Sequence, residues 1–251
     1  MFLVNTGYEV SQMFYDLMFP DEQKTVQEKN LPLVIPIGNL EYHGQHSVCG
    51  TDIIITEGIA KLLEQQSDIV LAPTFSYAPS SYAASGPQKG TIHLDMDVFE
   101  QYIKGLLRAF IEGGWTNIYI LIHHQYDMEI LFPLSLACLK AAKQTFFDMM
   151  EEQDGRGWFA SAGDLEIVMR KMNTVKVLPV MSRAIQEELG YDHAGKVECS
   201  LLAALRPDLT LVKPERAKGG EWFAQTAPEY SAEYGKRILD RCIEDLKSKI
   251  Q

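Results

Sequence analysis

The sequence predicts an α/β fold with a mainly parallel central sheet and helices on both of its faces. Four short apolar runs, each followed by turn residues, alternate with segments whose apolar residues recur at helical spacing. Strands and helices that alternate in this way form βαβ units, which build parallel sheets. The 251 residues show no internal repeat and no dividing linker, so we expect residues 1–251 to form a single domain.

The elements follow one another along the chain. The predicted strands are residues 33–37, 69–73, 118–122 and 175–179, and the predicted helices are residues 53–66, 97–111, 128–150 and 231–250. Asp97 is placed to cap the second helix, and the last helix carries its apolar residues on one side and should pack on the core. Residues 78–90, rich in Ser, Gly, Ala and Pro, predict a long loop near a site, and residues 151–157 predict a solvated turn.

Composition and charge exclude several classes of function. With 46% hydrophobic and 23% charged residues, the chain is typical of folded globular proteins. The net charge of -11 disfavours nucleic acid and anionic lipid as partners and attracts metal cations. No apolar run approaches the roughly 20 residues that span a bilayer, and the first residues lack a signal-peptide pattern, so we expect a cytoplasmic protein. Its four cysteines form no CxxC pair and predict buried, reduced thiols: Cys49, Cys138, Cys199 and Cys242.

A first group of metal-ligand types begins just past the first predicted strand. Glu41, His43 and Asp52 lie within twelve residues. Alternate side chains of an extended segment point the same way, so Glu41 and His43 can face one pocket while Tyr42 points elsewhere. Carboxylates and imidazoles together suit zinc, manganese or iron, and a carboxylate can bridge two ions, which makes Asp52 the bridging candidate. The alternative is structural: a solvated glutamate, a loop histidine and a helix cap.

A second group follows the strand 118–122, which runs into His123 and His124. Ligands of open parallel sheets bind beyond the carboxyl ends of the strands. Two strands therefore aim donors at one crevice, unless these histidines only hydrogen-bond to neighbouring loops.

A third group lies in residues 191–200, where a turn of small residues precedes a predicted helix start. Glu198 is placed to reach a metal, which leaves Asp192 and His193 for proton transfer. The alternative is an ordinary turn and the first turn of a helix.

Together these segments resemble the creatininase family. Its first motif is similar to Glu-x-His-Gly-x-His followed by Gly-Thr-Asp, here residues 41–46 and 50–52, and its later His-Ala-Gly-x-x-Glu-Thr-Ser is similar to residues 193–200, with Cys199 in place of threonine. The resemblance spans about residues 33–200. Where the family usually has Asn-Gly-His-Gly-Gly-Asn, residues 122–127 keep only a histidine. We take His124 as the ligand because it keeps the spacing to the next helix, with His123 as the alternative.

The resemblance implies a Rossmann-like α/β sandwich with two divalent ions, zinc and/or manganese, with iron also possible. It further implies hydrolysis of a creatinine-like cyclic or linear amide, a small-molecule substrate, in a homo-oligomer. We assign Glu41 and His124 to one ion, His43 and Glu198 to the other, and Asp52 to both. A hydroxide shared by the ions would attack the carbonyl, and His193, oriented by Asp192, would protonate the departing nitrogen.

The expected substrate contacts come from the loop region and the second group: Tyr77, Tyr82, Ser85 and Tyr126. Many family members have a histidine at the position of Ser85, so substrate contacts are expected to differ. Two alternatives to a creatinine-like activity stay open. One is a formamide deformylase or a peptide-trimming enzyme on the same scaffold. The other is a catalytically silent metal-binding protein, which the altered residues 122–127 suggest.

Overall fold

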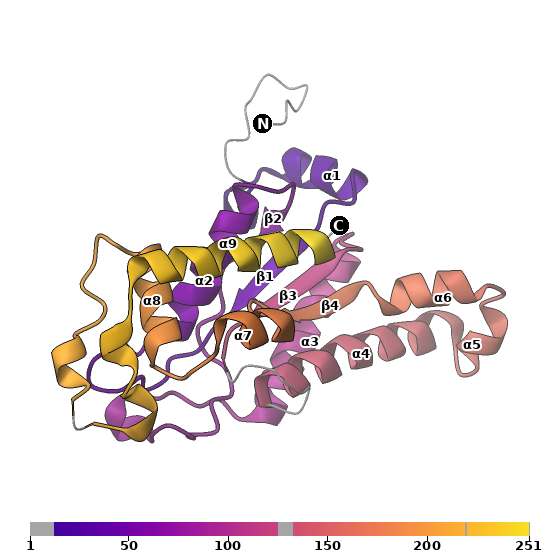
Figure 1. Cartoon of the computed structure of the whole chain (residues 1–251). Helices are drawn as coiled ribbons and strands as arrows, with labels where there is room; N and C mark the ends of the chain where they lie inside the picture. Colours follow the sequence, from indigo (N-terminus) through magenta and orange to yellow (C-terminus); the bar gives the residue numbers. More distant parts are fainter. Residues whose placement is uncertain (1–12, 125–132, 219, 251) are drawn as a thin grey trace.

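The computed structural model describes residues 13–124, 133–218 and 220–250 (Figure 1). Within them a four-stranded, all-parallel sheet has the order β2-β1-β3-β4. The strands are β1 (Leu33–Ile37), β2 (Val70–Leu71), β3 (Ile118–Ile122) and β4 (Val175–Pro179). The predicted fold class, a mixed α/β fold with a parallel sheet, is confirmed.

The helices are α1 (Pro20–Glu28), α2 (Thr51–Glu64), α3 (Met96–Glu112), α4 (Pro133–Asp154), α5 (Trp158–Ser161), α6 (Leu165–Met172), α7 (Arg183–Leu189), α8 (Lys196–Leu205) and α9 (Ala232–Lys249). Short 3₁₀ turns add η1 (Tyr15–Leu17), η2 (Pro87–Lys89), η3 (Pro214–Arg216), η4 (Trp222–Ala224) and η5 (Ala227–Glu229). None of the described helices is both long enough and apolar enough to cross a membrane.

The sheet separates two apolar cores because side chains alternate between its faces. Leu33, Ile35 and Ile37 of β1 pack with residues of α3 and α4, whereas Val34 packs with residues of α2, α8 and α9. Both faces are therefore covered, as the continuous apolar runs of a buried parallel sheet require. In Figure 1 α9 and α8 lie on one side of the strands and α3 and α4 on the other.

The register of the strands aligns their carboxyl ends. Ile37 pairs with Ile122, which in turn pairs with Pro179. Residues that follow β1 and β3 therefore leave the sheet at the same edge, and this alignment brings the first two predicted ligand groups together.

Several predicted boundaries were wrong. Asp95, not Asp97, caps α3, because its carboxylate accepts hydrogen bonds from the N–H groups of Asp97 and Val98. Strand β2 has two residues instead of the predicted five. The predicted turn at 151–157 was wrong in its first half, because α4 continues to Asp154. The predicted start of that helix, Met128, lies outside the described residues.

Candidate metal centre

The loop after β1 turns back on itself and fixes the first ligand segment. The Glu41 N–H donates to the Cys49 carbonyl at 3.0 Å, and the Tyr42 N–H donates to Thr91 Oγ1 at 3.1 Å. Gly44 has φ +74°, and a Cβ there would lie 2.6 Å from the His46 ring. Only glycine fits that turn without strain, which explains the glycine in the motif.

Five predicted ligands meet at the edge of the sheet. Each is at most 3% exposed, although they come from the loop after β1, from α2, from the end of β3 and from α8: Glu41, His43, Asp52, His124 and Glu198. Three buried carboxylates need compensating positive charge, because an uncompensated buried charge is very unfavourable. The cluster is therefore built to hold cations.

Asp52 divides its two carboxylate oxygens between two histidines. Its Oδ1 lies 3.2 Å from His43 Nε2, and its Oδ2 lies 2.8 Å from His124 Nδ1. Each histidine also faces a second carboxylate: Glu198 Oε2 is 3.4 Å from His43 Nε2, and Glu41 Oε2 is 3.1 Å from His124 Nδ1. Two groups of three donors thus share Asp52, and the donor atoms of each group lie within 4.8 Å of one another.

The tautomer of His43 shows that a proton or a metal ion is needed between its ring and the neighbouring carboxylates. Its Nδ1 lies 2.9 Å from the Glu41 carbonyl oxygen, which only accepts, so Nδ1 carries a hydrogen. Nε2 then faces Asp52 Oδ1 and Glu198 Oε2. A lone pair aimed at two carboxylates is repulsive unless a proton or a metal ion lies between them.

The charges of the cluster keep both rings protonated when no metal is bound. Burial alone would lower the pKa of His43, but the charges of Asp52 and Glu198 raise it to about 10. Burial also lowers the pKa of His124, but the charge of Asp52 raises it to about 10. In return, and against the effect of burial, the histidines hold the pKa values of Asp52 and Glu198 below their usual range. These protons occupy positions that metal ions would take.

The buried oxygen and nitrogen donors fit divalent ions such as zinc or manganese. Between the two histidines left open by the sequence, His124 lies between Glu41 and Asp52. His123 Nε2 instead lies 3.2 Å from Glu198 Oε1, where it can orient that carboxylate. The geometry therefore favours His124 as the ligand.

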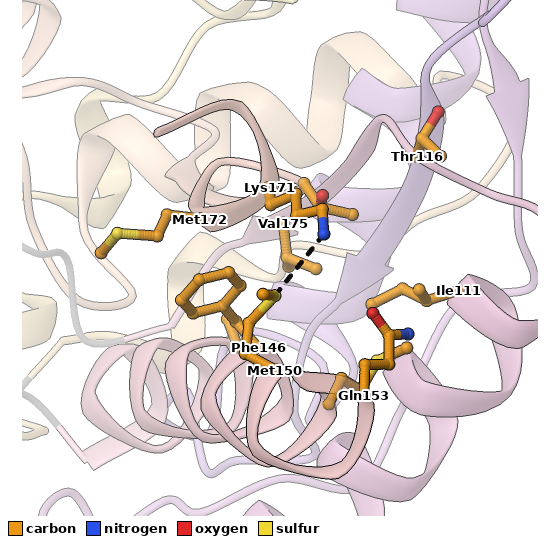
Figure 2. Close-up of a pocket in the computed structure, with 11 residues that line it drawn as sticks. Ile111, Thr116, Phe146, Met150, Gln153, Lys171, Met172 and Val175 are labelled. Carbon is orange, nitrogen blue, oxygen red and sulfur yellow. Dashed lines mark hydrogen bonds between the residues drawn. The ribbon is translucent and has the colours of Figure 1, made fainter. Parts of the chain in front are cut away.

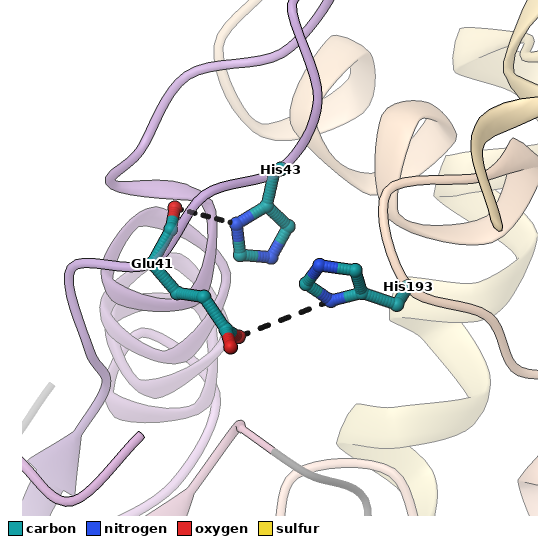
Figure 3. A group of neighbouring side chains, drawn as sticks. All are labelled: Glu41, His43 and His193. Atoms are coloured by element: carbon teal, nitrogen blue, oxygen red, sulfur yellow. Dashed lines mark hydrogen bonds and ion pairs between the residues drawn. The ribbon is translucent and has the colours of Figure 1, made fainter. Parts of the chain in front are cut away.

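His193 lies beside the cluster and is more accessible, with its side chain 30% exposed. Its Nε2–H donates to the Tyr42 carbonyl at 3.0 Å, so Nδ1 is the atom that faces Glu41 Oε2, at 3.9 Å (Figure 3). The ring centroid is 4.4 Å from that of His43. Glu41, His43 and His193 form a third group with metal-ligand spacing, so both a ligand role and a proton-transfer role suit Nδ1.

Asp192 is placed differently from our expectation. Its carboxylate accepts hydrogen bonds from the N–H groups of Gly195, Val197 and Glu198, so it fixes the start of α8. The carbonyl of Tyr42, not Asp192, provides the described hydrogen bond to the His193 ring. Burial, aided by the charge of Glu198, raises the pKa of Asp192 to about 6.

The cluster opens into a cavity of about 770 Å³. The residues that line it are Glu41, Asp52, Ala83, Ala84, His124, Tyr191, Asp192, His193, Glu198, Glu221, Trp222 and Phe223. No sequence pattern pointed to the segment 221–223, because that segment follows no predicted strand and carries no periodic pattern. It reaches the site through a contact between Glu221 and Tyr42, which are 179 positions apart.

The three predicted substrate contacts that lie in the described part of the chain are not among the residues that line this cavity. Ala83 and Ala84 line it in place of their neighbours Tyr82 and Ser85, and the Tyr82 ring packs against His93 at 5.0 Å. Tyr77 is 59% exposed and is also absent from the lining. Tyr126 lies outside the described residues.

A second cavity, of about 200 Å³, lies beside α4, α6 and β4 (Figure 2). Its lining includes Phe146, Met150 and Met172. No described carboxylate or imidazole lines it, so it has no metal-ligand character.

Comparisons with known proteins agree with the fold and the motifs. Residues 16–250 match the family model described as "Creatininase: Creatinine amidohydrolase". The chain is 23% identical over 265 residues to the creatinine amidohydrolase of Pseudomonas putida, which covers 94% of this chain and 95% of that protein. The structure titled "Creatininase Mn" has a TM-score of 0.73 at 20% identity and covers 95% of this chain and 97% of its own.

A mutant creatininase of Zn-Zn type has a TM-score of 0.70 at 19% identity, with the same shares of both chains covered. At these identities the structural likenesses show the fold, while the family model extends over nearly the whole chain. The match confirms the family resemblance of the motifs and the expected enzyme class, a hydrolase of C–N bonds other than peptide bonds. The chain therefore belongs to the creatininase family.

Proposed function

We propose that this protein hydrolyses an amide with the help of two divalent metal ions. Glu41 and His124 would hold one ion, His43 and Glu198 the other, and Asp52 both. The observation that carries the proposal is the division of the Asp52 oxygens between His43 and His124, each of which also faces a second carboxylate.

The relatives support the identity of the ions. Titles of solved creatininases at about 20% identity name manganese in one case and a zinc pair in another. The carboxylate and imidazole donors of this chain suit either metal. When bound, such ions polarise a carbonyl and lower the pKa of water, which makes a nucleophile available near neutral pH.

The chain's own residues supply the remaining chemistry. The Tyr42 carbonyl fixes the His193 ring through Nε2 and leaves Nδ1 at the cavity. A protonated Nδ1 would deliver its proton to the departing nitrogen, since an unprotonated amide anion is a poor leaving group. Asp192 holds the start of α8 and thereby positions Glu198.

Turnover of a panel of amides tests this proposal. Purified full-length protein, loaded with zinc or manganese, is compared with chelator-treated protein on creatinine, a formamide and short peptides. We expect hydrolysis of at least one of these amides by the metal-loaded protein alone.

Asp52→Asn is expected to abolish that activity. Asp164→Asn is the matched control, because Asp164 caps α6 away from the cavity and its substitution should leave activity unchanged. A protein that binds the ions but hydrolyses none of these amides, nor an aryl amide such as phenylacetamide, would instead support a catalytically silent metal-binding protein.

A further inference from the structure

Aromatic side chains form the outer part of the metal-site cavity. Trp222 is 83% exposed and Tyr191 54% exposed, whereas the acidic and imidazole donors of the cluster are almost fully buried. Burial therefore falls from the donors at the floor to the aromatic residues at the mouth. We call Tyr191, Trp222 and Phe223 the aromatic rim.

The rim segment is held in place by contacts on both sides. The Glu221 carboxylate accepts a hydrogen bond from the Tyr42 hydroxyl at 2.5 Å and another from the Lys89 ammonium at 3.2 Å. The Lys89 ammonium also lies 4.6 Å from the centre of the Tyr42 ring. These contacts connect the rim to the loop that carries Glu41 and His43, so the position of the rim depends on the loop that builds the site.

Phe223 lies between the exposed Trp222 ring and the His193 ring of the site. Its ring meets the His193 ring in an edge-to-face contact at 5.0 Å, and it meets Trp222 in the same way at 5.8 Å. Trp222 is thus positioned by its neighbours yet leaves most of its surface uncovered. A large exposed aromatic side chain at the mouth of a cavity is typical of a binding surface.

The cavity is large enough for a ligand that extends from the buried donors to the aromatic rim. Pockets of about 300–1,000 Å³ hold drug-sized molecules, and this cavity measures about 770 Å³. A small cyclic amide at the buried donors would fill only part of it. Ala83 and Ala84 also line the cavity, and their small side chains leave room for a ring.

From these observations we infer that the substrate is an amide with an aromatic ring close to the scissile C–N bond, and that the ring packs against Trp222. The inference rests on the proposed function and specifies its substrate class. Trp222 then determines specificity, while the buried donors and His193 act on the amide group itself.

Two hydroxamic acids separate the rim from the metal centre, because hydroxamates coordinate metals through their own oxygens and need no turnover. Acetohydroxamic acid carries a methyl group and phenylacetohydroxamic acid carries a phenyl ring. We expect the zinc-loaded full chain to bind the phenyl compound on the order of tenfold more tightly in isothermal titration calorimetry. Trp222→Ala should bring this ratio to about one mainly by weakening the phenyl compound.

Phe159→Ala is the matched control, because Phe159 is 60% exposed but lies outside the cavity; the ratio should stay unchanged. Equal binding of the two compounds by the parent protein, or an unchanged ratio in Trp222→Ala, would overturn the inference and leave the metal centre standing. If the zinc-loaded protein bound neither compound, the proposed function would fail and the inference with it.

Discussion

Metal uptake at pH 8 is expected to release about two protons from the histidine rings of each chain, in addition to the proton that a metal-bound water loses near neutral pH. In this experiment saturating zinc is added to metal-free protein. With pKa values of about 10, His43 and His124 are each about 99% protonated at pH 8. The carboxylates contribute no protons, because the pKa values of Asp52 and Glu198 lie below their usual range and that of Asp192 is about 6.

The sign of the pH dependence follows from the same pKa values. Metal affinity should rise with pH and level off as the pH passes about 10, where both rings lose their protons without metal. The metal-free fold behaves in the opposite way. Raised histidine pKa values contribute stability that is fully present below about 6.5, the unfolded value, and is lost as the pH rises toward 10.

Isothermal titration calorimetry in two buffers of different ionisation enthalpy measures the released protons directly. His124→Gln should release about one proton per chain fewer than the parent at saturating zinc, because only one protonated ring remains. His93→Gln is the control, since His93 is not among the described residues that line the cavity, and it should release as many protons as the parent. Release of fewer than one proton by the parent protein would show instead that both rings are neutral before the metal arrives.

Three further predictions concern single side chains. His193→Ala should keep its metal, measured by elemental analysis, but lose about 10² to 10⁴ in rate on a confirmed substrate; loss of metal would make His193 a ligand instead. Asp192→Ala removes the acceptor of three N–H groups at the start of α8, so thermal unfolding should show a loss of about 1–2 kcal/mol, and an unchanged melting temperature would contradict this role. Gly235→Ala should lower the free energy of unfolding by about 1–3 kcal/mol, because a Cβ there would lie 2.0 Å from the Ser200 carbonyl oxygen. Gly105→Ala is the control: the position has open space around it, so the substitution should be neutral or stabilise the fold by up to about 1 kcal/mol. Similar effects of the two substitutions would contradict the close packing of α9 on α8.

The sequence was most informative where burial is continuous. β1, β3 and β4 have the predicted bounds: β1 and β3 are uninterrupted, fully buried apolar runs, and β4 is apolar except for Lys176. β2 was overestimated because apolar residues continue beyond the two that pair with β1. The cap of α3 was misplaced because Asp95 and Asp97 are both suitable caps, and only the backbone geometry distinguishes them.

The clustering of the proposed ligands was predictable because each motif follows the end of a strand or opens a helix, and parallel strands bring those ends together. The positions of Asp192 and Trp222 in the structure were not predictable. Asp192 is an acidic residue beside the predicted site, but its carboxylate accepts hydrogen bonds from three nearby N–H groups. These hydrogen bonds depend on the conformation of the local turn, which the sequence pattern does not show. Trp222 reaches the site only through long-range contacts of its neighbours with Tyr42 and His193, which leave no pattern in the local sequence.

The central claim is that Asp52 serves two metal ions at once. The most direct test is metal content by elemental analysis of folded, zinc-saturated protein, compared between the parent, Asp52→Ala and Glu41→Ala. The shared carboxylate predicts about two equivalents in the parent, close to none in Asp52→Ala and about one in Glu41→Ala. Equal losses in the two variants, or a folded parent that stays metal-free after incubation with zinc or manganese, would contradict the claim.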